Sequence, residues 1–294
     1  MTTSIAIPTQ AIRVDSSFAT LLGQRSLPHV ALGIAAVAAL AIGAWGVAGR
    51  GVDLSALALG VAVFGAAGYV KGLTGIGLPT IGVALLSFGM PIPDAMAIVG
   101  LPALASNFWQ AAAGGRFLPL MRRLLPIVVP LCVTGAATVW LLGRGAPDWA
   151  LTVLAAVLMA YGAMGLARLR PRVPGRFETA LSPAIGVASG FISGLVGVPM
   201  MPVLPYLQAL DMKPEELVQS LGIVFCAASL AVVATMTGAG AIDLHGAAAS
   251  VGAVVPTMAA MSLGQAARRR LSVEQFRTAI FVALFVIGLI SVFR

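Results

Sequence analysis

Two apolar segments of this chain carry the same glycine-punctuated phrase, first as Gly68-Tyr-Val-Lys-Gly72-Leu-Thr-Gly75-Ile-Gly77-Leu-Pro79 and again, 122 residues later, as Gly190-Phe-Ile-Ser-Gly194-Leu-Val-Gly197-Val-Pro199. Glycines and a proline at this spacing predict a break in a helix. In lipid every backbone N–H and C=O group needs an internal partner, so a broken helix is tolerated only where it is buried in protein or lines a cavity. A duplicated break within apolar sequence therefore predicts a transport site.

The composition is that of a polytopic membrane protein. Hydrophobic residues make up 59% of the 294 positions, charged residues make up 10%, and the mean hydropathy is +1.00. A helix needs about 20 apolar residues to cross a bilayer. Uncharged apolar stretches of roughly this kind recur at 29–49, 54–70, 95–115, 124–143, 149–167, 217–241, 246–267 and 278–293. We therefore expect an all-α integral membrane protein.

The internal repeat extends beyond the two phrases. Gly100 pairs with Gly222 at the same offset. After a slip of four residues in a loop, further pairs are Pro130 with Pro256, Asp148 with Glu274, and Gly162 with Gly288. Two halves follow, 57–170 and 181–294, each predicted to be a broken, re-entrant helical hairpin (54–90 and 181–210) plus three transmembrane helices. The remaining segments are a cytoplasmic arm at 1–28, an extra transmembrane helix at 29–49 and a cytoplasmic linker at 171–180.

Charge indicates that the two halves have opposite orientations in the membrane. Short cytoplasmic loops collect Lys and Arg. One loop of the first half carries three arginines within 116–123, whereas its counterpart at 242–245 carries no Lys or Arg. The next loop shows the reverse, because the first half has only Arg144 and the second half has three arginines at 268–270. The sequence therefore predicts two inverted-topology repeats.

This scheme places the N-terminus in the cytoplasm and the C-terminus outside, with about seven full spans plus two hairpins. The hairpin legs, at roughly 13 to 17 residues, are short for full spans, which suits hairpins that enter and leave on one side. The second legs are expected to begin at Leu78 and Val198. The net charge of +8 comes mostly from arginines that flank apolar spans, so it indicates topology and not a nucleic-acid partner.

Lys71 is predicted to be the one charged side chain at membrane depth, because the ten acidic residues fall at span ends or in loops. A cation within the membrane costs on the order of 3 kcal/mol by insertion scales and marks a functional site by default. The natural partner of this cation is an anion. The alternatives are that Lys71 snorkels to a nearby interface or only fixes topology.

Further candidates are polar side chains close to the phrases. Asn107 and Gln110 share one face of the helix after the first hairpin, where substrate binding and interhelical hydrogen bonding are equally open. Ser229, at the position equivalent to Asn107, is a weaker candidate. The hydroxyl groups of Thr74 and Ser193 are suited either to donating to an anion or to capping broken helix ends.

The glycines of the phrases offer freed backbone N–H groups and, where each second leg starts, a positive helix end that favours anions. Close helix packing is the alternative role of the same glycines. The full predicted substrate-binding set is Lys71, Gly72, Thr74, Gly75, Gly77, Asn107, Gln110, Ser193, Gly194 and Gly197.

Catalytic chemistry lacks the residues to carry it. The sequence shows no Ser-His-Asp set, no paired carboxylates at depth, no Cys or His cluster and no P-loop. We therefore expect no enzymatic activity, no cofactor and no metal site.

The phrases, the helix starts Pro93-Asp94-Ala95 and Pro214-Glu-Glu216, and the pair Gly100 and Gly222 resemble the TauE/SafE sulfite-exporter family over residues 57–294. Members carry two copies of a phrase similar to G-x-x-x-G-x-x-G-x-G-G. Gly68, Gly72, Gly75 and Gly77 match the first copy. The second copy departs from it where Pro199 replaces a glycine.

The resemblance implies a multi-pass carrier of the bacterial inner membrane that exports sulfite or a small organosulfonate such as sulfoacetate. From the inverted halves and duplicated breaks we expect alternating access. Two alternatives remain open, an anion channel and a membrane assembly subunit that transports nothing. The sequence also leaves open whether the chain forms a homo-oligomer.

Overall fold

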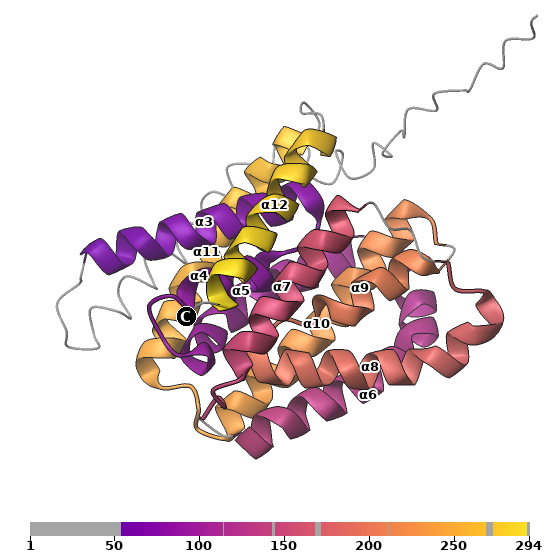
Figure 1. The fold of residues 1–294 in the computed structure, drawn as a ribbon, viewed down its shortest axis with the longest axis horizontal. Helices are drawn as coiled ribbons and strands as arrows, with labels where there is room; N and C mark the ends of the chain where they lie inside the picture. The colour runs from indigo at the N-terminus through magenta and orange to yellow at the C-terminus, as the bar shows by residue number, and fades with distance from the viewer. Residues whose placement is uncertain are drawn as a thin grey trace, which may run out of the picture.

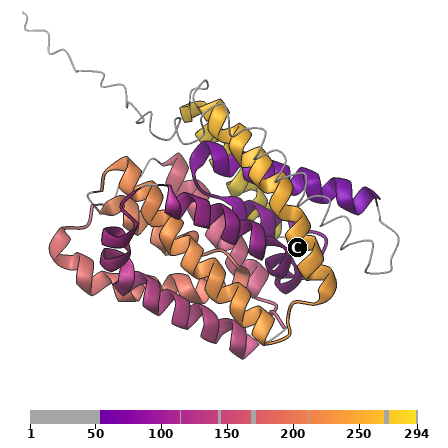
Figure 2. The same ribbon diagram turned by 180° about the vertical axis from the view of Figure 1, so that it is seen from behind.

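The computed structural model describes residues 54–113, 115–142, 145–167, 172–210, 212–268 and 273–292. Within these residues the chain is helical and contains no strand, which confirms the predicted all-α class. Figures 1 and 2 show the helices gathered into one bundle. The predicted arm at 1–28 and the predicted extra helix at 29–49 lie outside the described residues.

Each phrase of the sequence ends a long helix, which a short helix then follows. The elements in chain order are α3 (Leu54–Thr74), α4 (Leu78–Leu86), α5 (Ile92–Ala112), α6 (Phe117–Leu142), α7 (Ala150–Leu166), the 3-10 turn η1 (Gly175–Phe177), α8 (Glu178–Val196), α9 (Met200–Ala209), α10 (Pro214–Gly238), α11 (Leu244–Arg268) and α12 (Val273–Val292). The most extensive packing pairs α3 with α11, α6 with α8, α5 with α10, and α7 with α12. Because α5 also packs on α11 and α10 on α6, α5 and α10 connect the outer pairs.

The helix breaks occur where the phrases predict them. The chain between α3 and α4 passes through Gly75 and Gly77, whose φ angles are +82° and +102°, and α8 ends at Gly197, whose φ angle is +72°. These left-handed conformations favour glycine because it lacks a Cβ atom. The three glycines therefore fix the positions at which the long helices end.

The second legs begin at equivalent positions in the two phrases. Helix α4 begins at Leu78, as predicted, but α9 begins at Met200, two residues after the predicted Val198. Gly77 is the N-cap residue of α4, and Pro199, which stands 122 residues later, is the N-cap residue of α9. The prediction for α9 was wrong because it let the helix restart directly after Gly197.

The predicted leg lengths of roughly 13 to 17 residues are also wrong, because the first leg of each hairpin is longer and the second leg is shorter. Helix α3 has 21 residues and α8 has 19, whereas α4 has 9 and α9 has 10. The long legs run straight through Gly68 and Gly72, or through Gly190 and Gly194, before they end. Each hairpin is thus a long helix followed by a short one.

The helical glycines of the phrases lie in close helix contacts. A Cβ atom at Gly68 or Gly72 would collide with the backbone of α11, at Thr257 and Met261 respectively. A Cβ atom at Gly190 or Gly194 would collide in the same way with the backbone of α6, at Leu131 and Gly135. These four glycines therefore let α3 approach α11, and α8 approach α6, more closely than any larger residue would.

Within the described residues, four segments are long and apolar enough to cross a membrane, namely Phe117–Leu142, Gly175–Val196, Glu215–Gly238 and Leu244–Ala267. Two shorter apolar segments are Ala58–Thr74 and Ala150–Leu166. The predicted total of seven full spans plus two hairpins stays a prediction.

Candidate functional site

Lys71 lies in the last turn of α3, directly before the first break, where the N–H of Gly75 donates to its carbonyl oxygen (2.7 Å). Its side chain is 1% exposed, and it is the only charged side chain that is buried among the described residues. The two ion pairs of the described residues, Arg116 with Glu216 and Arg123 with Glu178, do not include it. Lys71 is therefore a buried cation without a carboxylate partner in the part of the chain that the structure describes.

A neutral amide is the hydrogen-bond partner of this cation. The Nζ atom of Lys71 donates to Oδ1 of Asn107 on α5, and Nδ2 of Asn107 donates to Oγ of Ser229 on α10 (3.3 Å). Because the oxygen of Ser229 accepts this bond, its own hydroxyl proton is left to donate elsewhere. The three side chains form a hydrogen-bonded chain from the end of α3 to α10.

The hydrogen bond to Asn107 offsets only part of the cost of burying a charge at Lys71. Taking one ion out of water costs several kcal/mol in real proteins. A hydrogen bond to a charged group returns about 1.5–3 kcal/mol, and a cation at the C-terminus of a helix such as α3 gains up to about 2 kcal/mol. The site therefore favours a counter-charge that the described part of the chain does not supply.

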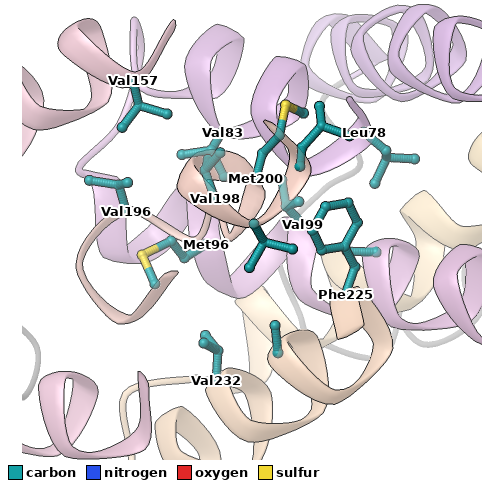
Figure 3. Packing of buried hydrophobic residues seen from close by; sticks show 14 of the residues in the cluster. Leu78, Val83, Met96, Val99, Val157, Val196, Val198, Met200, Phe225 and Val232 are labelled. Atoms are coloured by element: carbon teal, nitrogen blue, oxygen red, sulfur yellow. The ribbon is translucent and has the colours of Figure 1, made fainter. Parts of the chain in front are cut away.

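The far end of the hydrogen-bonded chain reaches a small cavity. Ser229 lines a space of about 20 Å³ between α4, α5, α10 and the break that separates α8 from α9. Its complete lining is Val83, Met96, Val99, Gly100, Ala103, Ser193, Gly197, Pro199, Ser229, Val232 and Val233. Two hydroxyl groups, of Ser193 and Ser229, are the polar side-chain groups of an otherwise apolar wall, part of which Figure 3 shows around Val83, Met96, Val99 and Val232.

The second break packs against the short helix of the first hairpin. A Cβ atom at Gly197 would lie 2.8 Å from Met96 of α5 and 3.5 Å from Val83 of α4. Figure 3 shows Val198 and Met200, which follow this break, among the same buried residues as Val83. The second break and α4 therefore enclose one side of the cavity.

Gln110 lies one turn after Asn107 on α5 and belongs to the surroundings of the first break. Its Nε2 atom donates to the carbonyl of Val218 on α10 (2.9 Å), while its Oε1 atom is buried without a hydrogen-bond partner. A Cβ atom at Gly75 would lie 3.8 Å from the same Nε2 atom. The amide of Gln110 thus ties α5 to α10 and leaves one acceptor unused beside the break.

Thr74 holds the end of α3. Its hydroxyl group lies 2.8 Å from the carbonyl of Val70 and 2.9 Å from the carbonyl of Ile76, and its oxygen accepts a bond from the N–H of Ile76 (3.3 Å). These contacts fit the capping role that the sequence left open for Thr74.

The predicted site residues thus fall into separate groups. Ser193 and Gly197 line the cavity, and Lys71 and Asn107 connect to it through Ser229. Gly75, Gly77, Thr74 and Gln110 surround the first break, while Gly72 and Gly194 lie in helix contacts. Ser229 was missing from the predicted set, although its offset of 122 residues from Asn107 was the signal that pointed to it.

Fold and site together define a polytopic helical membrane protein with a buried cation connected to a cavity at its helix breaks. Residues 59–290 match the family described as sulfite exporter TauE/SafE. The chain belongs to this family, which is one of transporters and not of enzymes. No curated protein and no solved structure matches the chain. The described residues hold no group of three or more His, Cys, Asp or Glu side chains that would bind a metal ion.

A double-mutant cycle tests the bond between Lys71 and Asn107. Asn107→Leu should lower the thermal unfolding midpoint of the detergent-purified protein, because it leaves the buried amine of Lys71 without its hydrogen-bond acceptor. In a Lys71→Met background the same change should cost less, with a coupling of about 1–3 kcal/mol.

Ser106→Ala is the matched control for this cycle. Ser106 lies on the same helix, and its hydroxyl group donates to the carbonyl of Ala103 (3.1 Å). The stability lost on Ser106→Ala should therefore be equal in the wild-type and Lys71→Met backgrounds. Equal costs for Asn107→Leu in both backgrounds would contradict the assignment.

Proposed function

We propose that this protein exports a small sulfur-containing anion, sulfite or an organosulfonate such as sulfoacetate, across the bacterial inner membrane by alternating access. Membership of the TauE/SafE family supports the substrate class. The observation that carries the proposal is the buried, carboxylate-free cation of Lys71, joined by two hydrogen bonds to a cavity at a helix break. An anion in this cavity supplies the missing counter-charge.

The charge of Lys71 is close enough to select for anions. Two hydrogen bonds and one amide group separate the ammonium from the cavity, which corresponds to a distance on the order of 7 Å. An anion bonded to Ser229 lies about 3 Å farther away, at roughly 10 Å, where two unit charges attract each other by about 1.7 kcal/mol for an effective dielectric constant near 20, or roughly 20-fold in affinity. The hydroxyl groups of Ser193 and Ser229 supply donors in direct contact.

The central helices support the inverted-repeat part of the proposal. Gly100 of α5 contacts Val233 of α10, and Gly222 of α10 contacts Ala111 of α5. Gly222 lies 122 residues after Gly100, and Val233 lies 122 residues after Ala111. The second contact is therefore the first contact with the two repeats exchanged. The early part of each helix contacts the late part of the other, so α5 and α10 cross antiparallel, as equivalent helices of inverted halves would.

The outer helices follow the same rule. Gly162 of α7 contacts Phe281 and Phe285 of α12, and Gly288 of α12 contacts Ala155 and Met159 of α7. After the four-residue slip the repeat offset is 126, so Gly288 is equivalent to Gly162, and Phe281 and Phe285 are equivalent to Ala155 and Met159. These two contacts are therefore also equivalent under the repeat. The contacts of α3 with α11 and of α8 with α6 are likewise equivalent. A pseudo-twofold axis between α5 and α10 accounts for all of these contacts.

The same symmetry explains where the cavity lies. Lys71 and Ser193 are equivalent positions, and so are Asn107 and Ser229, which bond to each other. The space between Ser193 and Ser229 is therefore the counterpart of the space that the Lys71 side chain fills beside Asn107. A short serine in place of a long lysine leaves this counterpart empty, which we propose makes room for the substrate.

Alternating access requires this cavity to open. A volume of about 20 Å³ holds roughly one water molecule and is too small for a sulfur oxyanion. On the side that we propose is cytoplasmic, ion pairs join Arg116 to Glu216 and Arg123 to Glu178. We infer that this conformation is closed toward the cytoplasm and that these pairs separate when the anion enters.

Export fits the electrical gradient. We place the N-terminus in the cytoplasm and the C-terminus outside. In a cell with a negative interior, an anion with one net charge is driven outward by about 2.3 kcal/mol per 100 mV.

Substrate binding tests the proposed site. Sulfite, sulfoacetate or thiosulfate should raise the unfolding midpoint of the purified protein, and chloride should not. Ser193→Ala and Ser229→Ala should each weaken this binding about 5- to 20-fold, because each removes one donor in contact with the anion. Affinity measured by titration of the midpoint gives the comparison.

Thr237→Ala is the control on α10, since the Thr237 hydroxyl group donates to the carbonyl of Val233 within its own helix (2.8 Å) and is exposed. The absence of any anion-specific shift, or equal affinities in the two serine variants and the wild type, would remove the proposed binding site.

Cysteine labelling tests the inverted topology. In intact cells a membrane-impermeant maleimide should label a cysteine at Asp148 but not one at Lys213, because we place the loop at 145–149 outside and the N-terminus of α10 in the cytoplasm. Opened cells should show both sites labelled, which controls for access. Labelling of both, or of Lys213→Cys alone, in intact cells would contradict the topology.

A further inference from the structure

We propose that Lys71 takes up one proton for each anion that the site binds and returns it to water when the anion leaves, so that the anion and a proton cross the membrane together. This inference rests on the proposed function, because it requires an anion at the cavity. It goes further by naming the coupled ion and the group that carries it.

Among the side chains that the structure describes, none supplies a counter-charge to Lys71 in the empty site. From α5 the side chains of Asn107 and Gln110 face this region, and both are neutral amides. On α11 the residues nearest to a Cβ atom at Gly72 are Met261, Gly264 and Gln265, which are also uncharged. The side chains of α4 carry no charge either.

One titratable group lies within electrostatic range of Lys71 on a neighbouring helix, the half-buried thiol of Cys226 on α10. On α3 itself Tyr69 is titratable, two residues away. Neither is a carboxylate. An ammonium at Lys71 in the empty site is therefore buried away from solvent and has no acid beside it among the described residues, and the amine avoids this cost by giving its proton to water.

An anion changes this balance. When an anion lies against Ser193 and Ser229, it attracts the ammonium through the Asn107–Ser229 bond, and the ammonium attracts the anion equally. Proton and anion then bind together, because each raises the affinity for the other. The loaded site carries one negative charge fewer than the anion alone. The empty site carries no charge.

This coupling remains compatible with export. A dianion such as sulfoacetate, accompanied by one proton, carries one net negative charge, which the membrane potential drives outward. A monoanion with its proton crosses without net charge, and its own concentration gradient and the pH gradient then set the direction.

The proton is counted by titration calorimetry of the full chain in detergent with sulfoacetate at about pH 8, repeated in buffers of different ionisation enthalpy. Both acid groups of sulfoacetate are ionised at this pH, so a proton that is taken up goes to the protein. The slope of the binding enthalpy against the buffer enthalpy should approach one proton per anion. The affinity should also fall as pH rises, by up to about tenfold per pH unit, because the neutral amine becomes the dominant form.

The chain offers matched variants because Lys71 and Lys213 are its only lysines. Lys71→Arg keeps a charge that does not titrate in this range, so it should bind the anion without proton uptake. Lys213→Arg, at an exposed site, should behave as the wild type. If sulfite is the only anion that binds, the proton uptake assigned to Lys71 is the uptake measured for the wild type minus the uptake measured for Lys71→Arg.

The outcomes separate the two proposals. Binding by the wild type without proton uptake and with a pH-independent affinity overturns the coupling and leaves the proposed function standing. Proton uptake that persists in Lys71→Arg assigns the proton to another group and overturns the role of Lys71. If none of the sulfur anions binds to the wild type, the proposed function fails and the coupling fails with it.

Discussion

A lysine that is buried without a carboxylate among the described residues is the constraint around which this site is arranged. The Lys71 ammonium is held at the end of α3 by the amide of Asn107, which in turn donates to Ser229. A neutral acceptor positions the amine without supplying a counter-charge, so a positive charge at Lys71 gains its partner only when an anion binds. Had an aspartate stood at position 107, the ion pair would already be complete and an anion would gain little from binding.

The glycines determine how the helices bring these groups together, and they do so in two distinct ways. Gly72 and Gly194 lie within long helices and allow close contact with α11 and α6. Gly75 and Gly197 end those helices through left-handed backbone conformations. The first pair sets the distance between helices, and the second pair sets where the polar ends of the helices lie. One sequence phrase therefore carries a packing function and a site-forming function, separated by three residues.

Much of this arrangement follows from sequence, because apolar length, helix breakers and a lone charge at depth are local signals. The all-α class, the start of α4 at Leu78 and the burial of Lys71 could be predicted in this way. The lengths of α3 and α8 could not, since glycines continue a helix when a neighbouring helix packs against them. Ser229 was only a weaker candidate, because its bond to Asn107 joins two residues 122 positions apart, and sequence reasoning did not predict that contact.

The most direct test of the account is a structure of the protein with 2-bromoethanesulfonate, whose bromine marks the position of the ligand by anomalous scattering. We predict that the sulfonate oxygens lie within about 3 Å of the hydroxyl groups of Ser193 and Ser229, in an enlarged form of the present cavity and next to the Lys71–Asn107 pair. A sulfonate bound elsewhere, with this cavity still closed and empty, would contradict the central claim that Lys71 serves an anion site.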